Sequence, residues 1–160
     1  MAIVTFYNGD PKDAPKTTMP ARLGANAIIT CKNRLLLEKR SDSDVWGLVG
    51  GGCKKWETGR QAIAREVYEE LGLRIAPERF RKLAVYDNPG RIAAFRDGSI
   101  WRMVIVVYAL ELEEEPEMHI SRESKALRFQ PGGNRGHPNR NHPQGYCGGL
   151  VLQRGKCPRL

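Results

Sequence analysis

Apolar and polar positions along the chain predict many short strands and one helix. Alternating or continuous apolar runs indicate strands at residues 3–7, 25–31, 34–39, 46–49, 80–87, 91–95, 99–111 and 126–129. The run at 103–110 is apolar throughout, which is typical of a central strand of a mixed sheet. Its length is too short to span a bilayer. The pattern therefore predicts an α/β domain built around one mixed sheet.

The helix is predicted at residues 59–71. Ile63, Val67 and Leu71 recur at four-residue spacing and form an apolar stripe. Thr58 and Gln61 match the spacing of a capping box at its start. Gly72 fits the left-handed residue that often ends a helix.

Acidic residues gather on and before this helix. Glu66, Glu69 and Glu70 lie at i, i+3 and i+4, so their side chains are neighbours on one face, and Glu57 lies in the preceding loop. Each like-charge pair at such spacing costs an isolated helix roughly 0.2–0.5 kcal/mol. Arg65 offsets only part of that repulsion. The cluster suits a hard divalent cation, with a solvated acidic face as the alternative.

Three consecutive glycines precede the loop that contains Glu57. Gly50, Gly51 and Gly52 allow the backbone to approach a ligand closely, and their carbonyl groups can supply neutral oxygen ligands. A triple glycine alone marks loops of many kinds. The joint spacing of glycine, loop glutamate, Arg-Glu and Glu-Glu-x-Gly is far more specific.

Residues 51–73 resemble the Nudix box, G-x5-E-x7-R-E-U-x-E-E-x-G-U with U aliphatic, without a mismatch. A looser resemblance extends over residues 22–129. It implies a Nudix α/β/α sandwich with a mixed sheet and a catalytic loop-helix. It also implies Mg²⁺ or Mn²⁺ as cofactor and hydrolysis of a nucleoside diphosphate linked to a group X. Many members have proline before the loop glycines, where this chain has Val49.

The resemblance assigns roles to individual residues. Its metal ligands would be Glu66, Glu69 and Glu70, with the Gly51 carbonyl and support from Glu57. Arg65 would orient the glutamates through salt bridges, and the general base would be Glu70 or Glu123. Substrate would contact Arg40 and the glycine loop, Gly50, Gly51 and Gly52. For Glu123 the alternative is a solvent-facing loop acid, and for Arg40 a solvated strand end.

The favoured function is pyrophosphohydrolysis of a nucleoside triphosphate, the MutT-type reaction, by attack of metal-activated water on phosphorus. The enzymic alternative is an ADP-ribose or nucleotide-sugar pyrophosphatase. A different class is a nucleotide- or RNA-binding module without turnover. An intact set of four glutamates argues against that class, because a pure binder does not need them.

The length, net charge and composition of the chain narrow the choice among these functions. The chain has 160 residues, fits one domain and has a net charge of +8, which suits anionic nucleotides. Weak RNA affinity would also fit that charge, although no aromatic-basic nucleic-acid motif appears and nucleic acid is not an expected partner. No signal peptide and no membrane segment are predicted, so a cytoplasmic location with four reduced cysteines is expected.

The two ends of the chain differ from the middle. Residues 1–20 are expected to be mostly irregular, and residues 21–129 form the predicted domain. Residues 130–160 contain seven glycines, four prolines and no acid. We hypothesise that a shifted reading frame begins near residue 129 or 130; a native basic tail is the alternative. Zinc binding there by His137, His142, Cys147 and Cys157 would lack the usual paired spacing. A missing covering helix would expose one sheet face and favour a homodimer or poor solubility.

Overall fold

The computed structural model describes residues 3–41 and 45–131. Within that part of the chain the elements are, in order, β1 (Ile3–Asn8), η1 (Pro11–Asp13), β2 (Arg22–Cys31), β3 (Arg34–Arg40), β4 (Trp46–Gly47), β5 (Val49–Gly52), α1 (Gly59–Leu71), η2 (Pro77–Arg79), β6 (Arg81–Tyr86), β7 (Arg91–Phe95), β8 (Ile100–Leu112) and β9 (Ser124–Pro131). Its one α-helix is α1, and none of the described helices is long and apolar enough to cross a membrane.

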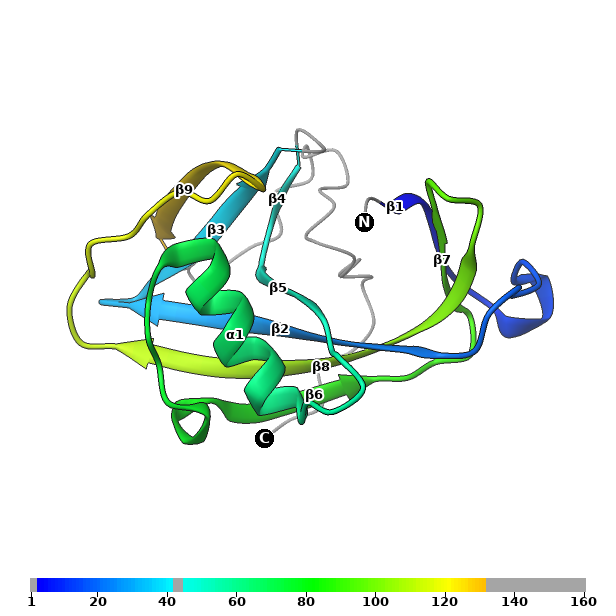
Figure 1. Cartoon of the computed structure of the whole chain (residues 1–160), viewed down its shortest axis with the longest axis horizontal. Coiled ribbons are helices and arrows are strands. Elements are labelled where there is room, and N and C mark those ends of the chain that lie inside the picture. The colour runs from blue at the N-terminus through cyan, green and yellow to red at the C-terminus, as the bar shows by residue number, and fades with distance from the viewer. Residues whose placement is uncertain (1–2, 42–44, 132–160) are drawn as a thin grey trace, which may run out of the picture.

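Strand β8 lies at the centre of the sheet (Figure 1). On one edge β2 runs parallel to it, from Arg22 opposite Met103 to Cys31 opposite Leu112. On the other edge β8 pairs antiparallel with β6 and, near its start, with β7, and β7 in turn pairs with β1. The central strand predicted from the apolar run is therefore confirmed.

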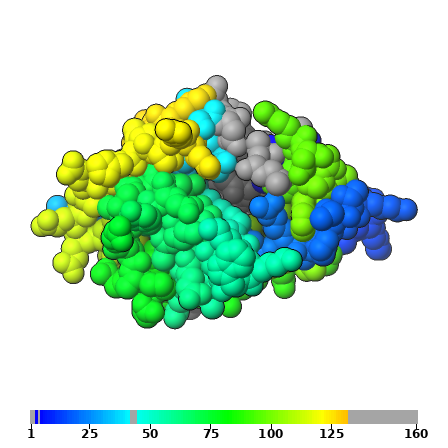
Figure 2. Space-filling model, in the orientation of Figure 1, coloured from blue at the N-terminus to red at the C-terminus, as the bar shows by residue number. Residues whose placement is uncertain are grey.

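The outer edge of β2 is divided between two partners. β5 pairs with residues 24–27, whereas β3 pairs only with Thr30 and Cys31. β3 therefore leaves the main sheet and is flanked by β4 and β9. In Figure 1 these strands lie beside the C-terminal end of α1 rather than in the plane of β2 and β8. The divergence brings β3 and β9 near the last turn of the helix, and in Figure 2 the yellow surface that includes β9 adjoins the green surface that includes α1.

The main core lies between α1 and one face of the sheet. The helix contributes fully buried side chains at Ala62, Ile63, Val67 and Leu71. Opposite them lie buried residues of the sheet and its flanks, namely Ala25, Ala27, Ile29, Leu36, Val49, Phe80, Tyr108 and Leu110. Full burial of one such aliphatic side chain stabilises by roughly 1.5–3 kcal/mol, so this stripe fixes how α1 lies on the sheet.

A second, smaller core lies at the end of the sheet where β7 and β8 meet. It consists of Ala93, Phe95, Met103, Ile105 and Val107, with Phe6, Ile28 and Trp101 packed against it. Because alternate residues of a strand face opposite sides, Ile105 and Val107 serve this core while Tyr108 and Leu110 serve the first.

The helix termini agree with the local sequence signals. The Thr58 hydroxyl accepts from the Gln61 backbone N–H at 3.3 Å, and the Thr58 N–H donates to Gln61 Oε1 at 2.9 Å. Gly72 adopts the left-handed conformation, with φ of 76°, and its N–H donates to the Tyr68 carbonyl. The predicted helix at 59–71 and its capping box are confirmed.

The strand predicted at residues 46–49 is wrong as a single element. Gly47 pairs with Glu38 of β3, whereas Val49 pairs with Ala27 of β2. Leu48 lies between the two pairings, so the segment divides into β4 and β5. The remaining strands agree with the prediction to within about three residues at their ends, and the edge strand at the N-terminus is confirmed as β1.

The architecture is an α/β fold with a mixed, strongly curled sheet and the predicted loop-helix on one face (Figure 1). The last predicted strand is present and extends to Pro131. Residues 132–160 lie outside the described part of the chain. The structure therefore does not test the reading-frame hypothesis or zinc binding by the two histidines and two cysteines of that segment.

Candidate active site

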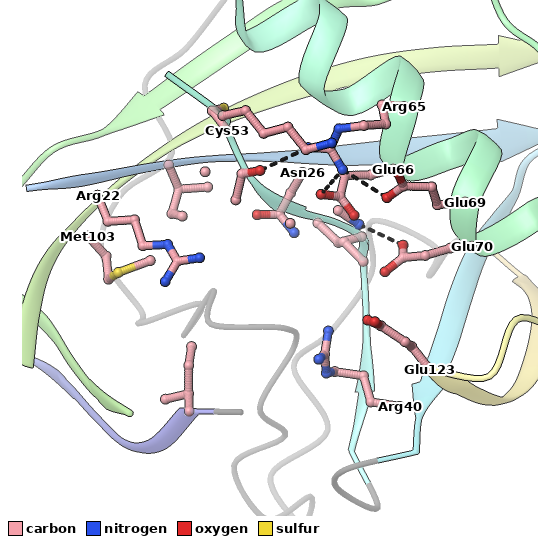
Figure 3. A pocket seen from close by; sticks show the side chains of 18 of the residues that line it. Arg22, Asn26, Arg40, Cys53, Arg65, Glu66, Glu69, Glu70, Met103 and Glu123 are labelled. Atoms are coloured by element: carbon pink, nitrogen blue, oxygen red, sulfur yellow. Dashed lines mark hydrogen bonds and ion pairs between the residues drawn. The ribbon is translucent and has the colours of Figure 1, made fainter. Parts of the chain in front are cut away.

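A cavity of about 880 Å³ lies beside α1, β5 and the start of β2 (Figure 3). Every residue predicted for the site except Glu57 lines it, namely Arg40, Gly50, Gly51, Gly52, Arg65, Glu66, Glu69, Glu70 and Glu123. They come from β3, β5, α1 and the turn before β9. The structure therefore brings together residues that are up to 83 positions apart in the chain.

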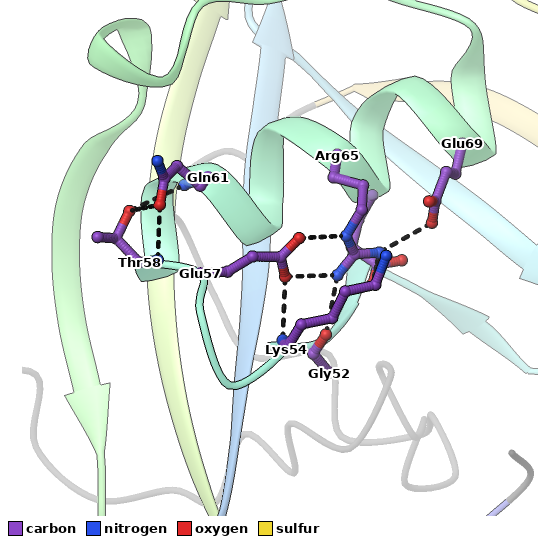
Figure 4. A network of polar contacts seen from close by, with 8 residues as sticks. Gly52, Lys54, Glu57, Thr58, Gln61, Arg65 and Glu69 are labelled. Carbon is purple, nitrogen blue, oxygen red and sulfur yellow. Dashed lines mark hydrogen bonds and ion pairs between the residues drawn. The ribbon is translucent and has the colours of Figure 1, made fainter.

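Arg65 joins the loop that contains Glu57 to the helix (Figure 4). Its Nε and Nη2 donate to the two oxygens of Glu57, at 2.7 and 3.0 Å. Nη1 donates to Glu66 Oε1 at 2.7 Å and to Glu69 Oε2 at 2.8 Å, and Nη2 also reaches the Gly52 carbonyl at 3.0 Å. A planar guanidinium can make such a fork, whereas a lysine ammonium cannot.

Glu57 does not line the cavity but connects the loop to the helix through Arg65. The hydrogen bond from Arg65 lowers its pKa to about 2, against the opposing effect of burial and with help from the Lys54 backbone N–H. That N–H donates to Glu57 Oε2 at 3.0 Å. Glu57 therefore stays ionised and holds the loop against α1.

Glu70 has the opposite surroundings. It is only 4% exposed, and the Gly50 N–H donates to its Oε2 at 3.1 Å. Burial, followed by the charges of Glu38 and Glu66, raises its pKa to about 9; the Gly50 hydrogen bond and Arg40 oppose this. Burial likewise raises the pKa of Glu66, against hydrogen bonding from Arg65. A positive ion near Glu70 would stabilise its ionised form.

The chemistry of the available ligand groups fits a hard divalent cation. It consists of carboxylates and loop carbonyls, the oxygen ligands that Mg²⁺ and Mn²⁺ take. Gly51 lies directly against Glu66, because a Cβ at Gly51 would come within 2.5 Å of Glu66 Oε1. Within residues 3–41 and 45–131, however, no three acidic, histidine or cysteine side chains converge on one point. Glu66 and Glu69 instead each direct one carboxylate oxygen to Arg65.

Glu123 and Arg40 face this acidic end from the diverging strands (Figure 3). Glu123 is exposed in the turn before β9, and its charge contributes to the raised pKa of Glu66. Arg40 is half-buried at the end of β3. The far end of the cavity has apolar lining from Phe95, Met103 and Ile105. Arg22 also lies there, with its guanidinium over the rings of Phe95 and Trp101 at 5.2 and 5.8 Å.

Some residues of this region were not predicted from the sequence. Glu38 is the most unexpected, since its carboxylate is 1% exposed on β3. Its sequence signal is its phase, because Glu38 alternates with the buried Leu36. Arg22 and Ser121 also line the cavity without a motif to mark them. Cys53 lines it too, and burial raises the pKa of its thiol, which disfavours the thiolate.

Comparison with known proteins gives a consistent result. The model of the NUDIX domain family matches residues 20–132. A MutT-like protein of Streptomyces ambofaciens is 32% identical over 86 residues, which cover 54% of each chain. The RNA pyrophosphohydrolase of Psychromonas ingrahamii (strain DSM 17664 / CCUG 51855 / 37) is 44% identical over 59 residues, which cover 36% of this chain and 32% of that protein.

A solved structure agrees with both. The MutT NUDIX hydrolase from Burkholderia pseudomallei is 31% identical, with a TM-score of 0.56, over 71% of this chain and 84% of that one. The chain spans about half the length of the MutT-like relative and about a third of the RNA pyrophosphohydrolase.

Proposed function

This chain belongs to the NUDIX family, and from that premise we propose that it is a divalent-metal-dependent pyrophosphohydrolase. Its substrate class is a nucleoside diphosphate linked to a further group, with nucleoside triphosphates preferred. The observation that carries the proposal is the buried Glu70, held beside two more carboxylates in a cavity large enough for a nucleotide. The 32% identity to a MutT-like protein supports the triphosphate preference.

The residues would divide the work by position. Glu66, Glu69 and Glu70 would hold the metal together with the Gly51 carbonyl. Arg65 and Glu57 would hold the loop against the helix. When bound, the ion polarises a phosphate and lowers the pKa of a bound water. Arg40, at the end of β3, is placed to contact a substrate phosphate, and either Glu70 or Glu123 accepts the proton of the attacking water.

The reaction is a substitution at phosphorus. Water oxygen forms the new bond to one phosphorus of the diphosphate bridge, and the bond from that phosphorus to the bridging oxygen breaks. The leaving phosphate takes the electron pair, and the proton of water passes to the base. With a nucleoside triphosphate the products are a nucleoside monophosphate and pyrophosphate. The nucleoside would lie toward the less polar end of the cavity, near Phe95 and Met103.

A second candidate substrate is the 5′-triphosphate end of an RNA. The specific observation is the 44% identity over 59 residues to a protein named as an RNA pyrophosphohydrolase. A net charge of +8 would also favour a polyanion over a single nucleotide.

A substrate panel tests these proposals. It comprises the common and oxidised nucleoside triphosphates, ADP-ribose, a nucleotide sugar and a 5′-triphosphorylated RNA, each with Mg²⁺ and with Mn²⁺. We expect the nucleoside triphosphates to give monophosphate and pyrophosphate with the highest kcat/KM, and we expect no turnover after chelation of the metal. If the parent turns over none of them with either ion, the enzymic proposal is wrong and a binding module takes its place. If ADP-ribose or RNA is preferred, the triphosphate assignment is wrong.

A further inference from the structure

A buried hydrogen bond joins the two strands that leave the main sheet. The Ser124 hydroxyl donates to Glu38 Oε1 at 2.5 Å, which links the start of β9 to β3. Glu38 is 1% exposed and Ser124 7% exposed. Burial of a carboxylate is costly unless it is hydrogen-bonded, so this contact is one that the fold maintains.

The hydrogen bond continues into the turn that contains Glu123. The hydroxyl groups of Ser121 and Ser124 lie 3.1 Å apart, and the Glu123 backbone N–H donates to Ser121 Oγ at 3.1 Å. The Ser124 N–H donates to the Ser121 carbonyl, and the Ser41 N–H donates to the Glu123 carbonyl at 2.7 Å. A continuous chain of hydrogen bonds therefore runs from Glu38 to the backbone N–H of Glu123, and a separate bond from Ser41 holds the Glu123 carbonyl.

The strand pairing changes register at the same place. Lys39 pairs with Ala126, but Arg40 pairs with Ser124, so one residue of β9 is left over as a bulge. Bulges re-aim side chains and are frequent beside active sites. Here the Glu123 carboxylate points toward Glu70 and Arg40 across the cavity (Figure 3).

We propose that Glu38 and Ser124 are positioning residues, whose hydrogen bond fixes the 121–124 turn so that Glu123 faces the end of the cavity that is lined by the α1 carboxylates. The inference rests on the proposed function for its catalytic consequence. It makes Glu123 the proton acceptor of the reaction and Glu38 a residue that acts on Glu123 through Ser124. A purely structural hydrogen bond between β3 and β9 would instead affect stability alone.

Substitutions of the two partners separate these roles. We expect Ser124→Ala to lower kcat about 10- to 100-fold, as outer-shell changes commonly do, with KM changed less than about threefold. Ser124→Thr keeps the hydroxyl donor, and Glu38→Gln keeps an oxygen acceptor. Each variant should therefore retain most of the kcat of the parent. Ser99→Ala is the matched control, because the Ser99 hydroxyl donates to Asp97 in another turn. We expect that variant to leave kcat unchanged.

Coupling to Glu123 provides the decisive measurement. In a Glu123→Gln background, Ser124→Ala should lower kcat less than about twofold further, because its effect passes through Glu123. In Ser124→Ala alone, hydrogen exchange at the Glu123 amide should become at least about tenfold faster. Additive losses in kcat, or unchanged exchange, in an active parent overturn the inference and leave the proposed function intact. A parent without turnover overturns both, whatever the exchange rates show.

Discussion

The loop before α1 and the last turn of α1 hold the same kind of side chain in opposite electrostatic states. Near its start, Glu57 accepts two hydrogen bonds from Arg65, which lower its pKa to about 2. At its last turn, Glu70 is buried against the charge of Glu38, and its pKa rises to about 9. Thirteen positions in the chain thus separate a carboxylate whose charge is balanced by an arginine from one whose charge is opposed by other carboxylates.

The difference shows which of the two carboxylates would be stabilised by a bound cation. Glu57 would gain little from a metal, because Arg65 already supplies its counter-charge. Glu70 faces Glu66 and Glu38, and an added cation would offset their repulsion. The start of the helix is accordingly expected to serve stability, and its end to serve catalysis.

The largest expected effect is at the end of the helix. We expect Glu70→Gln to lower kcat by about 10²–10⁴-fold, the range for loss of a group that takes part in proton transfer or charge stabilisation. Stability without metal should not fall, because burial and the charge of Glu38 already disfavour an ionised carboxyl at this position, and the amide stays neutral. The measurement is kcat with Mg²⁺ beside urea unfolding with chelator. Glu113→Gln, an exposed acid outside the cavity, is the control. Parent-like activity in Glu70→Gln would contradict the comparison.

Arg65→Lys tests the other end. Lysine keeps the charge but cannot bond Glu57, Glu66 and Glu69 together, so we expect the free energy of unfolding to fall by about 2 kcal/mol. Arg60→Lys, an exposed neighbour on the same helix, should change it by less than about 0.5 kcal/mol. Equal losses in the two variants would show that the fork does not hold the loop.

Acid should weaken the contact between Glu57 and Arg65 as the Glu57 carboxylate becomes protonated. Because its folded pKa is lowered from its ordinary value of 4.5 to about 2, its stabilisation is complete above pH 4.5 and is lost as pH falls through about 2. Glu57→Gln removes that ionisable group. Denaturation curves between pH 5 and pH 2 should therefore show a weaker decline in stability for Glu57→Gln than for the parent. Parallel declines would argue against the Glu57–Arg65 pair as the source.

The smallest effect is at the cap. Thr58→Ala should lower the free energy of unfolding by about 1 kcal/mol, since the hydroxyl no longer accepts from the Gln61 N–H. Because Thr58 does not line the cavity, kcat and KM should stay within about twofold of the parent. A selective fall in kcat would show that the start of the helix is not purely structural.

The sequence predicted those features whose causes are local. The bounds of α1 follow from Thr58, Gln61 and Gly72, and its acidic face follows from the 3.6-residue period. The division of residues 46–52 into β4 and β5 was not predictable, because it depends on two different partner strands. The approach of Glu38 to Glu70 was also missed: it arises where β3 leaves the sheet, a long-range consequence that the pattern near either residue does not encode.

Manganese binding tests the central claim most directly. Isothermal titration of the chelator-treated full chain with Mn²⁺ measures it without any assumption about substrate. We expect saturable binding in the parent, a Kd at least about 10-fold higher in Glu70→Gln, and no change in Glu113→Gln. Equal affinity in the parent and Glu70→Gln would contradict the account, because the buried carboxylate at the end of α1 would then not be a metal ligand.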